Sequence, residues 1–248
     1  MWTEIKAAYR GGITAAIAFP ALILIPAVAE FSQHIVEYRA GMFTSLAGMR
    51  AAADASDRMG FGLIKVLSLY LLIYWMSRAL AIGDGARLRM WGDARSVRLF
   101  AGVLAWSIGT GLLQLFGGSF LALVIPSARA IIAIGAVFLV ALIVIDIYVG
   151  PWKVGASLGN SRLTIPASFR LMNGNFWWSF GYFLVIFLPS LIIHYLLNGL
   201  AIGRPEAALW PILLVDAAVV GVLGLIGGAA LYVTARRATA RKGAALLP

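Results

Sequence analysis

Ser168–Gly181 reads Ser-Phe-Arg-Leu-Met-Asn-Gly-Asn-Phe-Trp-Trp-Ser-Phe-Gly and marks the place where a basic segment turns into an uncharged one. A similar stretch lies 72 residues upstream, where Ser96–Gly109 reads Ser-Val-Arg-Leu-Phe-Ala-Gly-Val-Leu-Ala-Trp-Ser-Ile-Gly. Seven of the 14 positions are identical in the same order. The pair indicates an internal repeat, in which each copy leads from a polar connection into a membrane span. The alternative is that small, aromatic and Arg residues recur at membrane entries for general reasons.

The composition around these stretches is that of a membrane protein. The chain has 248 residues, of which 62% are hydrophobic and 12% charged, and its mean hydropathy is +0.92. Soluble domains carry about 25% charged residues. Runs at 11–29, 99–128, 171–203 and 217–235 contain no Asp, Glu, Lys or Arg, and a spanning helix needs about 20 apolar residues. The sequence therefore predicts an all-α integral membrane protein, with residues 1–248 forming a single polytopic domain.

The uncharged runs predict six transmembrane helices arranged as three hairpins. The expected spans are Gly12–Ala29, Phe61–Ile82, a third beginning at Leu99, Ala130–Val149, Phe176–Leu200 and Trp210–Val233. Pro20 and Pro26 predict a kink in the first span, and either Gly117–Ser119 or Pro126 marks the turn after the third. Between and beside the spans we expect an interfacial helix at 1–10, an external polar helical connection at 30–58, an amphipathic cytoplasmic-face segment at 151–170 and a basic cytoplasmic tail at 234–248.

The basic residues predict the orientation of the chain. The net charge is +10, and Lys and Arg lie mainly in the connections. Thirteen fall on the side of the two termini and five on the other side. The positive-inside rule then places both termini in the cytoplasm, in the inner membrane of a bacterium. Nucleic-acid binding is not expected because there is no polar domain to carry it. The chain has no Cys, which excludes disulfides and thiolate metal sites.

The repeat also predicts residues that meet lipid. In each copy an Arg is followed by a Gly four positions later and a Trp eight positions later, which places the three on one helix stripe. We expect the Arg to bind anionic headgroups on the cytoplasmic side and the Gly to admit a close neighbour. The headgroup candidates are Arg98, Arg170, Trp106, Trp177 and Trp178. The helix-packing candidates are Gly102 and Gly174, together with Gly221, Gly224 and Gly228 of the last span.

Ionisable groups inside spans are functional candidates because burying them in lipid is costly. His194 and Asp216 lie at similar depth on adjacent antiparallel spans, so they are expected to touch, with Gln114 nearby. One interpretation is a proton or cation relay. The other is a buried hydrogen-bonded pair that joins two helices. Asp146, at the end of the fourth span, is expected to neutralise Arg170 or Lys153.

Glu30, His34 and Glu37 share one helical face and could ligate a divalent metal. The more ordinary interpretation is a solvated helix, so no metal and no cofactor are expected. The sequence contains no Gly-x-Ser-x-Gly elbow and no phosphate-binding Gly-rich loop with a Lys. Enzymatic activity is therefore not indicated.

Residues 168–177 resemble a segment of small six-span bacterial proteins of the YciC type and of the membrane domains joined to some glycerophosphodiester phosphodiesterases. There, Ser-aromatic-Arg-Leu is followed by Gly-Asn-Phe-Trp before the fifth span. The matching residues are Ser168, Phe169, Arg170, Leu171, Gly174, Asn175, Phe176 and Trp177. The resemblance implies the six-span plan. It does not imply phosphodiesterase activity, because the soluble catalytic domain is missing from this chain.

These observations predict a non-enzymatic accessory, scaffold or lipid-organising protein of the inner membrane. Its expected partners are membrane lipids with anionic headgroups on the cytoplasmic side, and a membrane-protein partner or a second copy of the chain. The alternative is a small permease or transporter that uses His194 and Asp216.

Overall fold

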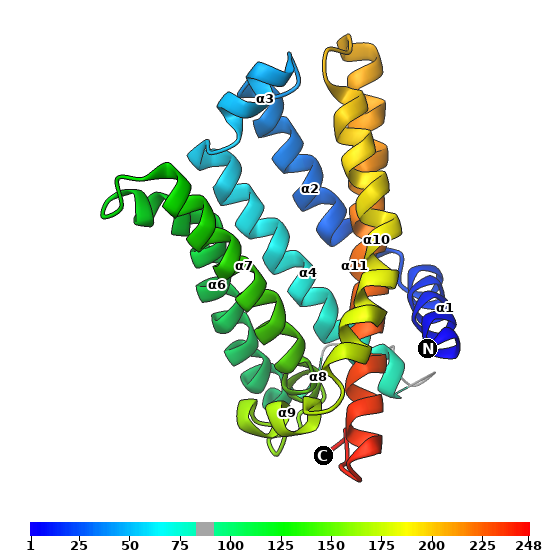
Figure 1. The fold of residues 1–248 in the computed structure, drawn as a ribbon. Helices are drawn as coiled ribbons and strands as arrows, with labels where there is room; N and C mark the ends of the chain where they lie inside the picture. Colours follow the sequence, from blue (N-terminus) through cyan, green and yellow to red (C-terminus); the bar gives the residue numbers. More distant parts are fainter. Residues whose placement is uncertain (83–91) are drawn as a thin grey trace.

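The computed structural model describes residues 1–82 and 92–248. Arg87 and Arg89, two of the thirteen basic residues counted on the side of the termini, lie outside this range. The protein is all-α, and no strand occurs in the described residues. The helices are α1 (Trp2–Ala18), α2 (Ala21–Arg39), α3 (Leu46–Ala52), α4 (Ser56–Ile82), α6 (Ala94–Ala122), α7 (Ala128–Tyr148), α8 (Gly150–Ser157), α9 (Ile165–Met172), α10 (Phe176–Ala201) and α11 (Glu206–Arg241). Figure 1 shows α3 at one end of the molecule and α9 with the C-terminus at the other, here called the α3 end and the α9 end.

The prediction of an all-α membrane protein is confirmed. Within the described residues, α4, α6, α7, α10 and α11 are long and apolar enough to cross a membrane, and α1 with α2 makes a sixth span if the bent pair is counted as one. The chain turns after the third span at 123–127, beside Pro126, while Gly117 and Gly118 remain inside α6.

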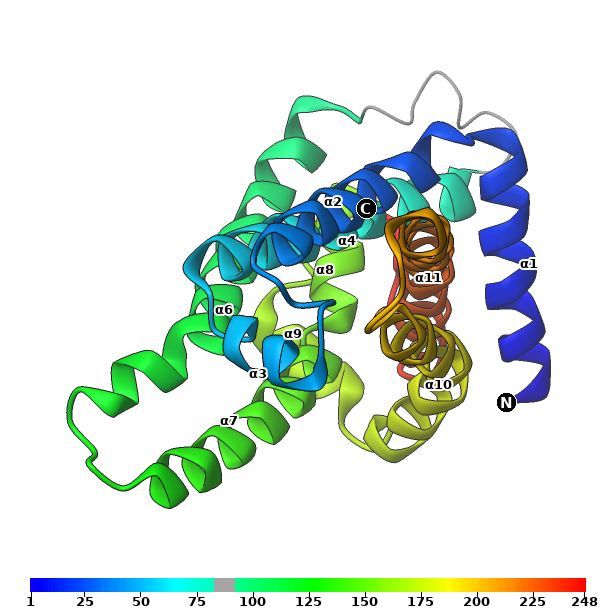
Figure 2. The ribbon, with the colours of Figure 1, turned by 90° about the horizontal axis from the view of Figure 1, so that it is seen from above.

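The first expected span, Gly12–Ala29, differs from the structure. The chain breaks at Phe19–Pro20, and α1 and α2 meet at 95°. Proline lacks the N–H needed to continue the helix. Pro26, by contrast, stays inside α2. Viewed from the α3 end, α1 lies across the view whereas α10 and α11 are seen almost end-on (Figure 2). The helix expected at 1–10 therefore extends to Ala18.

Several other expected boundaries shift towards longer helices, while one expected segment is divided. Residues 30–39 of the expected external connection belong to α2, and residues 56–58 belong to α4. The amphipathic segment at 151–170 is divided between α8 and α9. The basic tail at 234–248 is helical as far as Arg241. Because α2 continues past Ala29, its acidic and imidazole side chains lie inside the bundle.

Helix α11 is the centre of the bundle, and α1, α2, α4 and α10 pack around it through one apolar core. Glycine makes this close packing possible. A Cβ at Gly221 would lie 2.7 Å from the Ile23 backbone oxygen, and one at Gly228 would lie 2.9 Å from Met76 Cβ. A Cβ at Gly224 would lie 2.6 Å from Leu72 Cδ1. The glycine face of α11 thus sits directly against α2 and α4.

The α6–α7 hairpin diverges from this core towards the α3 end (Figure 1). Helix α7 buries only Ile147 among its described residues, and its hydrophobic side chains, such as Val137 and Val140, are exposed. The separation leaves space between α7 on one side and α10 with α11 on the other.

The two copies of the repeat have different backbones. The first lies wholly inside α6, so its Arg, Gly and Trp follow one continuous helix. The second is interrupted after α9, and Gly174 has φ +81°, a left-handed turn conformation that glycine adopts without strain. The predicted common helix stripe is therefore wrong for the second copy. Neither Gly102 nor Gly174 admits a close neighbour, since a Cβ on Gly102 would meet only Trp152 at 4.0 Å and one on Gly174 would meet nothing within 4 Å.

Candidate functional site

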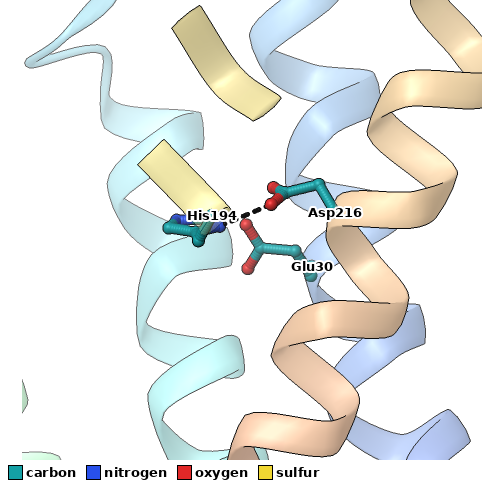
Figure 3. A group of neighbouring side chains, drawn as sticks. All are labelled: Glu30, His194 and Asp216. Carbon is teal, nitrogen blue, oxygen red and sulfur yellow. Dashed lines mark hydrogen bonds and ion pairs between the residues drawn. The ribbon is translucent and has the colours of Figure 1, made fainter. Parts of the chain in front are cut away.

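A buried ionic cluster joins α2, α10 and α11 on the α3 side of the molecule. Its centre consists of Glu30, His34, His194 and Asp216. Glu30, His34 and Asp216 are each at most 1% exposed, and the His194 side chain is 16% exposed. Figure 3 shows Glu30, His194 and Asp216 directed towards one another from three helices. We call these four residues the cluster centre.

His34 places a carboxylate at each of its ring nitrogens. Nδ1 lies 2.9 Å from Glu37 Oε2, and Nε2 lies 2.9 Å from Asp216 Oδ2. A neutral imidazole carries only one N–H, so it can donate to only one of the two carboxylates. The other nitrogen then presents a lone pair to a carboxylate oxygen. The arrangement therefore requires a cation at the second nitrogen, which is either a proton or a metal ion.

Asp216 is the meeting point of the cluster. Besides His34, it contacts His194 Nδ1 through Oδ1 at 2.8 Å, and it accepts a hydrogen bond from Asn198 Nδ2 at 2.8 Å. The contact between His194 and Asp216 that the sequence predicts is present. Because three side chains from two other helices converge on this carboxylate, it ties α2 and α10 to α11.

A second layer of polar side chains surrounds the centre, here called the cluster rim. Lys65 Nζ lies 2.9 Å from Glu30 Oε2, and Arg58 Nε donates to Glu37 Oε1 at 2.9 Å. Gln33 donates to the same Glu37 oxygen at 2.8 Å. The rim consists of Gln33, Glu37, Arg58, Lys65 and Asn198. These partners supply the compensation that buried charges need.

The charges of centre and rim do not cancel. Glu30, Glu37 and Asp216 are three carboxylates, whereas Arg58 and Lys65 are two cations. With both imidazoles neutral, the cluster carries one net negative charge. One added proton neutralises this charge, and a divalent metal ion would change it to one net positive charge.

The sequence predicted the contact of His194 with Asp216 and the shared face of Glu30, His34 and Glu37, but it did not predict that the two groups meet. The shared helical face of Glu30, His34 and Glu37 is real, yet it is buried against α11 and not solvated. Gln114, expected near His194, lines the apolar cavity described next. Asp54 and Asp57 are exposed. The participation of Lys65 and Arg58 was missed, because both could equally have extended to the membrane surface.

The second prominent feature is an apolar cavity of about 540 Å³ between α4, α6, α7, α10 and α11. Aliphatic and aromatic side chains such as Leu142, Phe183 and Phe187 form most of its wall, and glycines of α11 form part of it. Gln114, Thr110, Tyr70 and Asp146 supply the few polar groups. Its volume falls within the range of about 300–1,000 Å³ that is typical of small-molecule sites.

Towards the α9 end, the cavity wall includes Asp146, which belongs to an ion pair. Asp146 pairs with Lys153 of α8, which settles the choice that the sequence left between Lys153 and Arg170. Tyr70 donates to Asp146 at 2.8 Å and accepts from Lys153 at 3.1 Å. Burial is the largest single effect and lowers the pKa of Lys153, but the neighbouring Asp146 carboxylate and Tyr70 hydroxyl together raise the pKa overall. Lys153 therefore stays charged although it is fully buried.

The predicted headgroup residues all lie towards the α9 end. Arg98 and Arg170 are exposed, and Trp177 is 79% exposed. Trp106 packs edge-to-face on Trp152, and Trp178 lies beneath Arg237, whose guanidinium carbon is 4.1 Å from the ring centre. Arg162, Arg170 and Lys242 line a further cavity of about 460 Å³, and no Asp or Glu is among its lining residues.

Comparison with known proteins gives no family for this chain. No protein-family model matches it, and searches of curated proteins and of solved structures find no match.

Proposed function

We propose that this protein is a non-enzymatic, lipid-binding component of the bacterial inner membrane, with both termini in the cytoplasm. The observation that supports the proposal is the apolar cavity of about 540 Å³ between the α6–α7 hairpin and α10–α11. An acyl chain would fill it, because an apolar cavity among helices excludes water and accepts hydrocarbon. The protein would thereby organise lipid, alone or beside a membrane-protein partner or a second copy.

The charges at the α9 end support the same proposal. Arg98 and Arg170 are exposed there, and the basic cavity beneath α9 adds Arg162 and Lys242. Arg binds phosphate through a planar fork of donors, and basic groups beside a membrane attract anionic lipid by about 1 kcal/mol each. The proposed lipid is therefore anionic.

Cavity-filling substitutions test the proposal. Leu142→Trp places a large ring in the cavity, whereas Val140→Trp places the same ring on the exposed side of α7. After purification in mild detergent, mass spectrometry measures the lipid retained per protein. We expect the wild type and Val140→Trp to retain lipid and Leu142→Trp to lose most of it. Equal retention in all three proteins would rule out the cavity as the lipid site.

A second candidate function, a proton-coupled permease, is favoured by the chain of contacts from Glu37 through His34 and Asp216 to His194. Imidazoles that touch carboxylates at separate nitrogens can pass a proton along such a chain. Proton flux into liposomes containing the protein, followed with a pH-sensitive dye, tests this function. The variant carrying both His194→Phe and Asp216→Leu should fold and conduct no protons, while flux equal to that of the wild type would exclude the relay.

A further inference from the structure

We propose that the cluster centre binds one divalent transition-metal ion of the Zn²⁺ class. The ligands would be Glu30, His34, His194 and Asp216. This site is distinct from the lipid cavity and does not rest on the proposed function. This site also differs from the metal site Glu30, His34 and Glu37 that the sequence suggested. Glu37 is not a ligand, because it contacts His34 Nδ1, the ring nitrogen that faces away from the centre. His194 and Asp216 come instead from α10 and α11.

The ligand atoms already converge. One ligand atom each from Glu30, His194 and Asp216 lies within 4.8 Å of the other two. His34 Nε2 approaches the same two carboxylates, at 2.9 Å from Asp216 Oδ2 and 3.5 Å from Glu30 Oε1. Zinc bonds to nitrogen and oxygen of about 2.0–2.1 Å place neighbouring ligand atoms of a tetrahedron about 3.3 Å apart. The atoms of Glu30, His194 and Asp216 lie up to 4.8 Å apart, so they must close in by up to about 1.5 Å to enclose the ion. His34 lies outside this group of three and would join the ion only after such a movement.

The chemistry of the four ligands selects the class of metal. Two imidazoles with two carboxylates suit Zn²⁺ and neighbouring first-row metals, while Ca²⁺ and Mg²⁺ prefer sites made only of oxygen. With its Nδ1 proton donated to Glu37, His34 presents the Nε2 lone pair to the centre. This carboxylate–histidine arrangement orients histidine ligands in many metal sites.

Glu30 divides its two oxygens between Lys65 and the centre. Its side chain is 1% exposed, and Lys65 Nζ lies 2.9 Å from Oε2. Oε1, 3.5 Å from His34 Nε2, is the oxygen that faces the centre. Since the cluster carries one net negative charge with neutral imidazoles, a divalent ion brings it to one net positive charge.

Metal content and stability together test the site. The protein, freed of any affinity tag, is stripped with a chelator, incubated with Zn²⁺ and passed through a desalting column. We expect one zinc per chain and a rise in the melting temperature on zinc addition. His194→Gln removes a ligand but keeps a polar side chain beside Asp216, so it should fold, lose the zinc-dependent rise and bind zinc at least tenfold more weakly.

Tyr195→Phe is the matched control, because Tyr195 is the exposed neighbour of His194 on the same helix. It should bind zinc like the wild type. Co²⁺ gives a second readout, since a tetrahedral site of this kind produces a visible absorption band that should be absent in His194→Gln. Substoichiometric zinc in the wild type, or zinc bound equally by the wild type and His194→Gln, would mean an adventitious ion only and would overturn the proposal.

Discussion

Asp216 is the residue on which the buried ionic cluster depends most. It is fully buried, and His34, His194 and Asn198 all use its carboxylate. A change at this position strands polar groups on two other helices at once. The energetic consequence is therefore larger than that of a single interhelical hydrogen bond.

We predict that Asp216→Leu lowers the free energy of unfolding by about 2 kcal/mol, because three interhelical bonds at about 0.6 kcal/mol each are lost. In the Asp216→Leu variant, His194→Phe should lower the free energy of unfolding by less than it does in the wild type, because the hydrogen-bond partner of His194 is already absent. Unfolding in mixed micelles measures both effects. The exposed Asp54→Asn is the control and should stay within about 0.5 kcal/mol of the wild type. An Asp216→Leu variant as stable as this control would contradict the prediction.

Contacts between single residues could be predicted from the sequence where the depth of each residue in its span was enough to bring the two together. His194 and Asp216 lie on adjacent spans at similar depth, and they touch. His34 could not be assigned in the same way, because its environment depends on the break at Pro20 that carries α2 into the bundle. A hydropathy pattern records which residues are apolar, but it does not record where a helix changes direction.

Among the elements, α11 has the most demanding packing. Its glycine face meets backbone atoms of α2 and α4, so there is little room for even one methyl group. In α6, by contrast, Gly117 has no atom within 4 Å of an added Cβ. The same substitution should therefore have opposite effects in the two helices.

We predict that Gly221→Ala destabilises the protein by about 1–3 kcal/mol, because the new Cβ would lie 2.7 Å from the Ile23 backbone oxygen. Gly117→Ala should instead stabilise it by about 0.5–1 kcal/mol, through the better helix propensity of alanine. Thermal unfolding of the two variants side by side measures both. If Gly221→Ala unfolded at the same temperature as the wild type, α2 would be able to move away from α11 without loss of stability, and the prediction would be wrong.

The spacing of Gly221, Gly224 and Gly228 predicted this contact face because a Gly-x-x-x-Gly pair has one dominant use in membranes. The repeat was a weaker guide. Gly102 and Gly174 are equivalent positions of the repeat, but Gly102 lies in a helix interior and Gly174 in a left-handed turn. Glycine suits both conformations, so its presence alone could not distinguish them.

At the level of the whole molecule, the chain has two ends of different character. The α9 end carries the C-terminus, the basic cavity and the exposed Arg98 and Arg170, whereas the α3 end carries the connection between α2 and α4 (Figure 1). Hydropathy and basic residues predicted the number of long helices closely, because the bilayer fixes their length. The divergence of α7 from α10 could not be predicted, since α7 between residues 130 and 145 and α10 along its whole length carry no Asp, Glu, Lys or Arg that would indicate their neighbours.

We predict that a reporter fused after Pro248 reads cytoplasmic and that one inserted near Gly48 reads external. The excess of basic residues on the side of the termini is the reason. Paired reporters, one active only in the cytoplasm and one only outside it, measure the two positions. A cytoplasmic signal at Gly48 would contradict a membrane crossing by α2.

The ionic cluster also bears on how the chain is synthesised. His34 and Asp216 are 182 residues apart, so at about 5–20 residues per second the ribosome makes them roughly 9–36 s apart. The α2–α4 hairpin, however, already contains the pairs Glu30–Lys65 and Glu37–Arg58, and the α10–α11 hairpin brings His194 together with Asp216. Each hairpin therefore enters the bilayer with counter-charges of its own, and the nascent chain need not wait for its last helix to shield its first buried acids.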